Sequence, residues 1–496
     1  MKFKLIIFLL ILSFLLLSCG TKKILPPFKN TDNTLGNYYI KKVDFPASAT
    51  IEEKVEMASR VIPTTNQYKW QSLELTAFIH FGINTFTGAE WGTGKESPSQ
   101  FNPTDLDVDQ WVRVLKDAGF KLIILTAKHH DGFCLWPTKT TEHSIKKSPY
   151  KNGNGDIVKE FSEACKKYNV KMGIYLSPWD MNASSYGKGD EYNDFYVAQL
   201  TELVTGYGEI AELWFDGAKG NGPNQDYDFE RWLAVLNKYQ PKAVSANMGE
   251  DVRWVGNERG YGRETEWSVQ AYKPNSYADS KSYNNSIGIQ ETSTDMGSRK
   301  VLERVNSIYW YPSEVDVSIR DGWFYHDNEI PKSLDKLIEI YYSSVGLNSV
   351  LLLNVPPDTR GKFDDKDVEV LKQFGDYIKN TFNNGFIQNT DNYWYNAKTG
   401  MSKEYDLKSP STINVLLIQE DIMKGQRVEK FSVEVYSSGQ WDKITVNSKE
   451  PNLTTIGYKR LVKFDTVQNA EKIRITLEEA RTNANISQVN VYYSAK

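Results

Sequence analysis

Polar side chains end several apolar runs that are typical of buried strands. His80 ends one run, the triplet His129-His130-Asp131 ends a second, and Asp216 ends a third, where Gly217 follows. A carboxylate at the end of a buried strand is costly unless it is paired or used. Such residues could bind a polar ligand or take part in acid–base and nucleophilic chemistry. From this feature alone, Asp216 could equally be the N-cap of a helix.

The histidines do not form a metal-binding pattern. The chain has five histidines, and neither an H-x-H nor an HExxH motif occurs among them. Consecutive side chains on a strand point to opposite faces, so His129 and His130 could bind one ion only if the strand had already ended. We therefore expect no metal and no cofactor. Hydrogen bonds to substrate hydroxyls are the favoured role, with a satisfied core histidine as the alternative for each.

Asp216 has the right chemistry for the nucleophile of a retaining glycosidase, provided that a second carboxyl lies close by. Such enzymes place their two carboxyl groups ~5–5.5 Å apart, one attacking the anomeric carbon and one protonating the leaving oxygen. The candidates for the acid are Glu258, Glu264, Glu266 and Glu314. Glu258 follows a predicted strand and should face the same rim as Asp216. To act as an acid near neutral pH it needs a raised pKa, which partial burial and a neighbouring charge can supply.

The elements that would position these residues alternate between strands and helices from about residue 70 to 385. Apolar runs predict strands over 77–83, 121–128, 171–178, 211–216, 243–248, 266–271, 315–319 and 349–355, and stripes at helical spacing lie between them, for example from Trp111 to Ala118 and from Ile157 to Tyr168. Eight such strands predict an α/β fold, a (β/α)8-like barrel over 51–385, whose functional residues lie at the C-terminal strand ends. Residues 272–310 lack a clear period and are interpreted as a long loop over that face.

Beyond residue 386 the helical periodicity disappears. Short alternating segments separated by turn residues replace it, as in 412–418, 431–436, 472–477 and 489–493. This pattern predicts a C-terminal antiparallel β-sandwich over 386–496.

The N-terminus is typical of an exported bacterial lipoprotein. Lys2 and Lys4 precede an apolar run of residues 5–17, which is too short to span a bilayer, and the run ends in Leu-Ser-Cys19-Gly. We expect residues 1–18 to be a signal peptide, Cys19 to be lipidated and residues 19–50 to form a tether and lead-in. The alternative is an ordinary secretory signal. The expected location is the membrane, facing the periplasm or the cell surface.

Composition narrows the class of ligand. The formal net charge of −4 argues against a nucleic-acid partner, because such proteins usually carry a basic face. The aromatic content, 13 Trp, 29 Tyr and 22 Phe, is compatible with sugar-stacking surfaces or with a Tyr-rich core.

Several motifs together resemble the α-L-fucosidases of glycoside hydrolase family 29. The motifs are His80-Phe81-Gly82, Glu90-Trp91, the block TAKHHDGF at 126–133, WFDG at 214–217 and the segment 345–357 that ends in LLLNVPP. The resemblance covers nearly the whole predicted barrel. It implies a retaining mechanism without a metal, with Asp216 as the nucleophile and with a fucose pocket lined by His80, Glu90, Trp91, His129, His130, Tyr175 and Trp214.

Two further segments resemble the subgroup that cleaves α-1,3/1,4-linked fucose. RWVGNE at 253–258 implies that Glu258 is the acid/base, and Glu314 in EVDVSIRDGW is the alternative. The C-terminal region resembles discoidin-like, galactose-binding sandwiches, and it could bind sugar or merely support the barrel. The expected function is release of L-fucose from Lewis-type glycans. The alternatives are a carbohydrate-binding lipoprotein without activity and a fucosidase with a broad or α-1,2 preference.

Overall fold

The computed structural model describes residues 38–389 and 392–496. The predicted signal peptide, Cys19 and most of the predicted tether lie outside these residues. Within the described part, no helix combines the length and the apolar character needed to cross a membrane.

Eight parallel strands form the central sheet, in the order β8-β7-β6-β5-β4-β13-β12-β9. Their bounds are β4 Leu75–Ile79, β5 Leu122–Lys128, β6 Lys171–Leu176, β7 Glu212–Phe215, β8 Val244–Asn247, β9 Arg253–Trp254, β12 Ser313–Ser318 and β13 Val350–Asn354. An isolated parallel bridge between Ala246 and Val252 joins the two edge regions, so the sheet is a nearly closed barrel. The predicted (β/α)8-like barrel is therefore confirmed.

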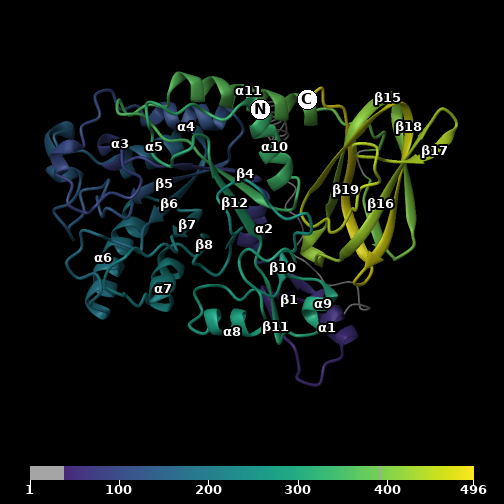
Figure 1. Cartoon of the computed structure of the whole chain (residues 1–496), viewed down its shortest axis with the longest axis horizontal. Helices are drawn as coiled ribbons and strands as arrows, with labels where there is room; N and C mark the ends of the chain where they lie inside the picture. The colour runs from purple at the N-terminus through teal and green to yellow at the C-terminus, as the bar shows by residue number, and fades with distance from the viewer. Residues whose placement is uncertain (1–37, 390–391) are drawn as a thin grey trace, which may run out of the picture. The chain divides into compact units, whose positions relative to one another are not determined.

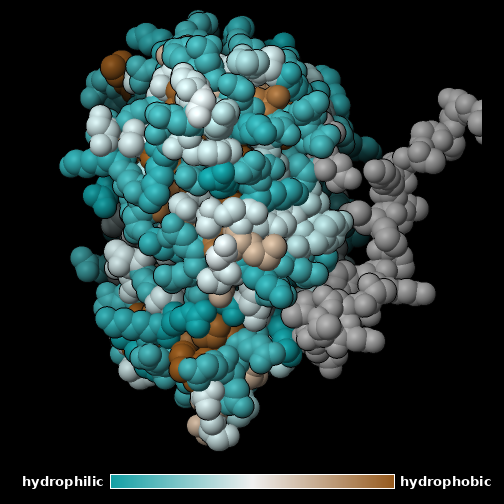
Figure 2. Space-filling model, turned by 90° about the vertical axis from the view of Figure 1, so that its right-hand side faces the viewer, coloured by the Kyte–Doolittle hydropathy of each residue, from teal (hydrophilic) through white to brown (hydrophobic). Residues whose placement is uncertain are grey.

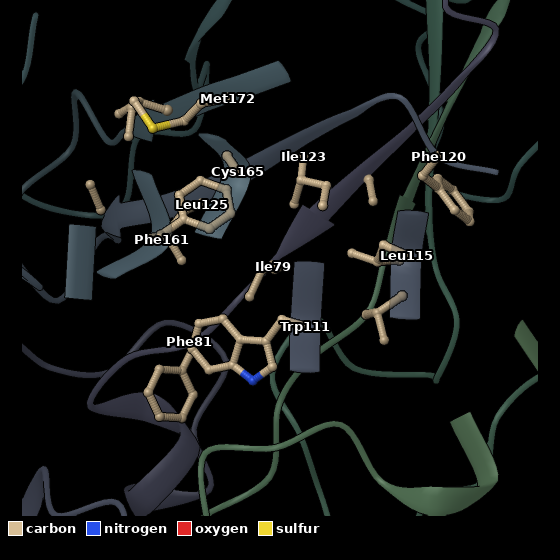
Figure 3. Close-up of a cluster of buried hydrophobic side chains, with 14 of the residues drawn as sticks. Ile79, Phe81, Trp111, Leu115, Phe120, Ile123, Leu125, Phe161, Cys165 and Met172 are labelled. Atoms are coloured by element: carbon tan, nitrogen blue, oxygen red, sulfur yellow. The ribbon is translucent and has the colours of Figure 1, made fainter. Parts of the chain in front are cut away.

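Helices pack against the outside of this sheet (Figure 1). They include α4 Val108–Asp117, α5 Ile157–Tyr168, α6 Asp190–Gly206, α7 Phe229–Tyr239, α10 Leu334–Ser344 and α11 Asp365–Phe382. Figure 3 shows one part of the resulting core, where Trp111 and Leu115 of α4 meet Ile123 of β5 and Phe161 of α5. These side chains are fully buried, and the burial of their apolar surface stabilises the barrel. Cys165, on the same face of α5, is a buried free thiol.

One predicted barrel strand belongs elsewhere. The segment 266–271 forms β10 Val269–Gln270, which pairs with β11 Ser307–Trp310 in a separate antiparallel sheet completed by β2 Lys42–Asp44. Its place in the barrel is taken by β9, which is only two residues long and pairs with β12. A strand so short carries no detectable alternation in the sequence, whereas 266–271 does.

Residues 272–310 are not the long loop that we expected over the active face. They contain α8 Ser280–Ser286, α9 Arg299–Leu302 and β11. With β2 and α1 Ile51–Ala58 they share a small apolar cluster that includes Val43, Val55 and Ile308. These elements lie together at the bottom of Figure 1. The segment 38–62, which also forms β1 Tyr39–Ile40 and β3 Val61–Ile62, thus supplies strands as well as a connection. The helix α2 Thr65–Gln71 connects this segment to the first barrel strand, β4. The short helix α3 Asn84–Thr87 follows β4.

The C-terminal region is an antiparallel six-stranded sheet with the order β14-β19-β15-β18-β16-β17. The strands are β14 Trp394–Ala397, β15 Ser402–Glu420, β16 Val428–Ser437, β17 Gln440–Lys443, β18 Arg460–Ala480 and β19 Ala484–Tyr492. Several register shifts interrupt the pairing of β15 with β18. Such bulges bend long strands, and side chains from β14, β15, β16, β18 and β19 meet in one apolar core, as in a sandwich. The predicted segment 472–477 is therefore one part of the much longer strand β18.

The face in Figure 2, which is the right-hand side of Figure 1, is largely hydrophilic. Its apolar residues form small separate groups among hydrophilic ones.

Candidate active site

A small cavity lies at the C-terminal ends of the barrel strands. Its volume is about 100 Å³, and its lining consists of Phe78, His80, Glu90, Trp91, His129, His130, Tyr175, Trp214, Asp216, Ala218, Glu258, Asp316 and Trp323. The structure thus brings together all nine residues predicted for catalysis and substrate contact. The alternative acid, Glu314, is not among the lining residues. Residues on or after β4, β5, β6, β7, β9 and β12 meet here because parallel strands all end at one rim.

His129 and His130 both line the cavity because the strand ends before them. The pairing of β5 with β6 shifts register between Thr126 and Lys128, and β5 ends at Lys128. The strict alternation of side chains therefore does not reach the two histidines, whose ring centroids lie 4.1 Å apart. Gly132 follows with φ +81°, a backbone conformation that favours glycine.

Asp216 is held at the end of β7 by two kinds of donor. The Tyr175 hydroxyl donates to Oδ2 at 2.8 Å, and the Ala218 backbone N–H donates to Oδ1 at 2.8 Å. His130 Nε2 lies 3.8 Å from Oδ2, beyond hydrogen-bond distance. One hydrogen bond to each oxygen therefore fixes the orientation of the carboxylate, and part of the side chain faces the cavity.

Glu258 enters the cavity from the loop after β9. The indole N–H of Trp323 donates to its Oε2 at 3.3 Å. Partial burial, followed by the charges of Asp216 and Glu90, raises the pKa of Glu258 above the ordinary range, and the Trp323 hydrogen bond opposes this. The residue as a whole is exposed on the loop, so access to water limits the rise.

Asp316 of β12 is a third carboxyl in the lining. It is almost fully buried, and its Oδ1 accepts a hydrogen bond of 2.7 Å from Trp254 Nε1. Burial raises the pKa of Asp316 well above its ordinary value, and the charge of Glu258 adds to the rise. Burial therefore favours the protonated, neutral form of the Asp316 carboxyl.

Glu90 and Trp91 lie at the mouth. Glu90 accepts hydrogen bonds from the Trp323 backbone N–H at 2.8 Å and from His326 Nε2 at 2.7 Å. Trp91 is 56% exposed, and its ring centroid lies 5.6 Å from that of Trp179. An exposed indole over a polar pocket can stack on the C–H face of a sugar.

Glu314 lies outside the cavity lining. It is buried in the barrel, where its Oε2 accepts a hydrogen bond of 2.9 Å from Trp214 Nε1. Burial and the charge of Glu212 raise the pKa of Glu314 well above its ordinary value. Its position suits it to orient the Trp214 indole, which stacks on Tyr175 with ring centroids 5.5 Å apart.

Sequence reasoning missed four of the lining residues, Phe78, Ala218, Asp316 and Trp323. Phe78 lies inside the largely apolar strand β4, whereas Asp316 alternates with Val315 and Val317 in β12. Such alternation does not distinguish a polar face that lines a cavity from one that faces solvent. Trp323 stands at the end of the motif EVDVSIRDGW, whose resemblance to the α-1,3/1,4 subgroup points to Glu314 and not to the tryptophan. Within residues 38–389 and 392–496, no group of three or more His, Cys, Asp or Glu side chains is placed to hold a metal ion.

A parallel barrel with two carboxyls, imidazoles and indoles in a small cavity at its C-terminal rim has the arrangement of a sugar-cleaving hydrolase of the barrel class. The family model described as Alpha-L-fucosidase matches residues 47–383. The chain therefore belongs to the α-L-fucosidase family, glycoside hydrolase family 29.

Relatives and solved structures agree with this assignment. The chain is 40% identical over 464 residues to alpha-L-fucosidase 1 of Arabidopsis thaliana, covering 87% of each chain. A putative alpha-L-fucosidase from Bacteroides ovatus is 55% identical with a TM-score of 0.90, over 93% of this chain and 79% of that one. A family 29 fucosidase of Ruminococcus gnavus, solved in complex with fucose, is 34% identical with a TM-score of 0.76, over 88% and 95% of the two chains.

Proposed function

We propose that this protein is a retaining exo-α-L-fucosidase that releases L-fucose from α-1,3/1,4-fucosylated, Lewis-type glycans. The observation that carries the proposal is that Asp216 and Glu258 line one cavity in different electrostatic settings. Asp216 is oriented by Tyr175 and Ala218, while partial burial raises the pKa of Glu258 and so favours its protonated form.

The reaction would proceed in two displacements. In the first, an Asp216 oxygen attacks the anomeric carbon of fucose, the glycosidic C–O bond breaks, and Glu258 gives its proton to the leaving oxygen. In the second, Glu258 takes a proton from water, whose oxygen attacks the same carbon and displaces Asp216. Two inversions at one carbon give net retention.

The size of the cavity supports action on a chain end. At about 100 Å³ it is much smaller than the ~300–1,000 Å³ of pockets for drug-sized ligands, and so it suits one terminal monosaccharide. The linkage preference rests on the resemblance of RWVGNE at 253–258 to the α-1,3/1,4 subgroup.

Product chromatography tests the activity and the linkage together. The protein is incubated with a Lewis a or Lewis x trisaccharide and, separately, with 2′-fucosyllactose, and Asp216→Asn serves as the inactive control. We expect fucose mainly from the Lewis sugar. Fucose mainly from 2′-fucosyllactose would overturn the linkage preference, and no fucose from any of these sugars would overturn the proposed activity.

We further propose that the protein is anchored in the cell envelope through a lipid on Cys19. The support is the apolar run that ends in Leu-Ser-Cys-Gly. Detergent phase partition of the protein expressed with its own N-terminus tests this proposal. Partition into the detergent phase that Cys19→Ala abolishes is the expected result, and an unchanged distribution in that variant would contradict it.

A further inference from the structure

The side chain of Asn354 determines which nitrogen of His80 carries a proton. Asn354 ends β13, is fully buried, and donates from Nδ2 to the Trp323 carbonyl at 2.8 Å and to Ser318 Oγ at 2.9 Å. A carbonyl can only accept, so this contact fixes the orientation of the amide. Its Oδ1 then faces His80 Nδ1 at 2.9 Å. Because Oδ1 is also only an acceptor, Nδ1 of His80 must carry the hydrogen.

Ser177 does the same for His130. Its hydroxyl lies 2.7 Å from the Trp179 carbonyl and 2.7 Å from His130 Nδ1. The single hydroxyl hydrogen goes to the carbonyl, which cannot donate. The hydrogen between Ser177 and the ring therefore belongs to Nδ1 of His130. Ser177 is fully buried just after β6, so water does not compete for either bond.

Both rings are neutral near pH 7. Burial lowers the pKa of His80 to about 4, although the hydrogen bond to Asn354 and the charge of Asp216 act in the opposite direction. Burial also lowers the pKa of His130, with Lys128 adding to the effect and Asp216 opposing it. A neutral imidazole protonated at Nδ1 has a bare Nε2, which can only accept a hydrogen bond.

We propose that Asn354 and Ser177 are positioning residues that hold His80 and His130 in the Nδ1–H tautomer, so that each ring offers the sugar an unprotonated Nε2. This inference rests on the proposed function and deepens it. It makes two of the cavity histidines acceptors of substrate hydroxyl hydrogens. A fucose hydroxyl bound in this way must act as a donor.

The tautomer of His130 also matters for Asp216. Nε2 lies 3.8 Å from Asp216 Oδ2, and when unprotonated it cannot donate to that oxygen. The carboxylate then keeps electron density that a further donor would withdraw, since hydrogen bonds to the charged form stabilise it. Loss of the Ser177 hydroxyl would allow the Nε2–H tautomer, which could donate to Asp216. A better-stabilised carboxylate attacks the anomeric carbon more slowly.

Nitrogen NMR of the ¹⁵N-histidine-labelled protein reads the tautomers directly. Protonated and bare ring nitrogens give well-separated signals, and His80→Gln and His130→Gln assign them. We expect a protonated Nδ1 and a bare Nε2 for both residues at neutral pH. A protonated Nε2 on either ring in the wild-type protein would overturn the proposal.

Variants of Ser177 test the cause. Ser177→Ala should convert the His130 signals to the Nε2–H form or to a mixture and leave His80 unchanged, while Ser177→Thr, which keeps a hydroxyl, should retain the wild-type form. Ser148→Ala is the matched control, because Ser148 is also buried and donates to a backbone carbonyl, that of Ile145, outside the cavity lining. Unchanged His130 signals in Ser177→Ala would contradict the role of Ser177.

Kinetics supply the second measurement. Ser177→Ala should lower kcat for an aryl α-L-fucoside on the order of tenfold with a smaller change in KM, because an interaction that matters in the transition state is altered. Ser177→Thr should restore most of the loss. A rise in KM on the order of tenfold, with kcat itself unchanged, would contradict the link to Asp216. If the wild-type protein released no fucose, the proposed function would fail, yet the NMR experiment would still decide the tautomers.

Discussion

Two carboxyl groups of the cavity differ because their immediate surroundings differ. Asp216 accepts one hydrogen bond from a phenol and one from a backbone N–H, which orient both of its carboxylate oxygens. Glu258 has a weaker 3.3 Å contact with an indole and lies near the charges of Asp216 and Glu90, which favour its protonated form. An oriented carboxylate beside a carboxyl group with a raised pKa is suited to separate nucleophile and acid roles.

Replacement of Asp216 by Gly should abolish turnover and leave room for a small anion. Without the carboxylate no fucosyl–enzyme can form, so we expect a loss of at least ~10⁴-fold in kcat. Azide or formate should restore part of the activity on an activated aryl fucoside, and azide should give a β-fucosyl azide detectable by mass spectrometry. Activity close to that of the wild type would rule out Asp216 as the nucleophile.

Replacement of Glu258 by Ala should matter most where the leaving group needs a proton. We expect a loss of ~10²–10⁴-fold in kcat/KM on a Lewis trisaccharide and a much smaller loss on an aryl fucoside with a good leaving group. In the wild-type protein, kcat/KM should fall as pH rises through the raised pKa of Glu258, and this alkaline limb should disappear in the variant.

Glu314→Gln is the matched control for that experiment. Glu314 acts on the cavity through Trp214, so its replacement should affect both substrates by a similar factor. Stronger dependence on the leaving group in Glu314→Gln than in Glu258→Ala would reverse the two assignments.

The sequence predicts the site well where a residue lies in a distinctive motif at the end of a strand. His80, the HHD triplet and Asp216 all stand at such points. It does not predict the role of Asp316, because the alternation of β12 also suits a solvent-facing strand, and only burial and the contact with Trp254 show that this carboxyl is enclosed. Nor does it predict which nitrogen of a histidine is protonated. For His80 this depends on Asn354, which is 274 residues away in the sequence.

At the level of elements, the turn after β5 places both adjacent histidines in the cavity. Its geometry depends on Gly132, where a Cβ would overlap Asp180 Oδ1 and approach Asn182 Cβ to 2.9 Å. Asp180 in turn forms a buried ion pair of 2.8 Å with Lys128, the last residue of β5. The glycine, the ion pair and the end of the strand therefore form one support.

Gly132→Ala should disturb that support. We expect a loss of ~1–3 kcal/mol in the free energy of unfolding and a fall in kcat/KM, because Asp180 must move and a buried charge pair is weakened. Thermal unfolding and kinetics measure the two effects. Gly400→Ala is the control, since Gly400 has the same φ of +81° with no atom within 4 Å of its Cβ. Equal losses in both variants would mean that backbone strain alone is responsible.

The elements that the sequence misplaces are those whose identity depends on distant partners. β9 is two residues long and is a strand because β12 pairs with it. The segment 266–271 alternates as a strand does, but its strand β10 pairs with β11 in another sheet. In contrast, α4 and α5 carry complete apolar stripes and are predicted almost to their ends.

On the scale of the whole described molecule, the barrel and the sandwich share a core. Val415, Leu417, Leu461 and Tyr492 of the sandwich belong to the same buried cluster as the barrel side chains. The contact is also polar, because Asn348 accepts from the Tyr458 backbone N–H at 2.7 Å and its own N–H donates to the Lys459 carbonyl at 2.9 Å. A buried interface of this kind favours a structural role for the sandwich, whether or not it also binds sugar.

A shared core predicts one cooperative unfolding transition for residues 38–496. Ile475→Ala, in the sandwich's own apolar core, should cost ~2–5 kcal/mol and lower the temperature at which the cavity loses activity, although Ile475 is not among the residues that line it. Calorimetry and residual-activity curves should shift together, as they should for Leu461→Ala in the shared cluster. Ile330→Ala, at a side chain 71% exposed, should change neither. Two separate heat-absorption peaks, with activity following only one of them, would show that the barrel folds independently of the sandwich.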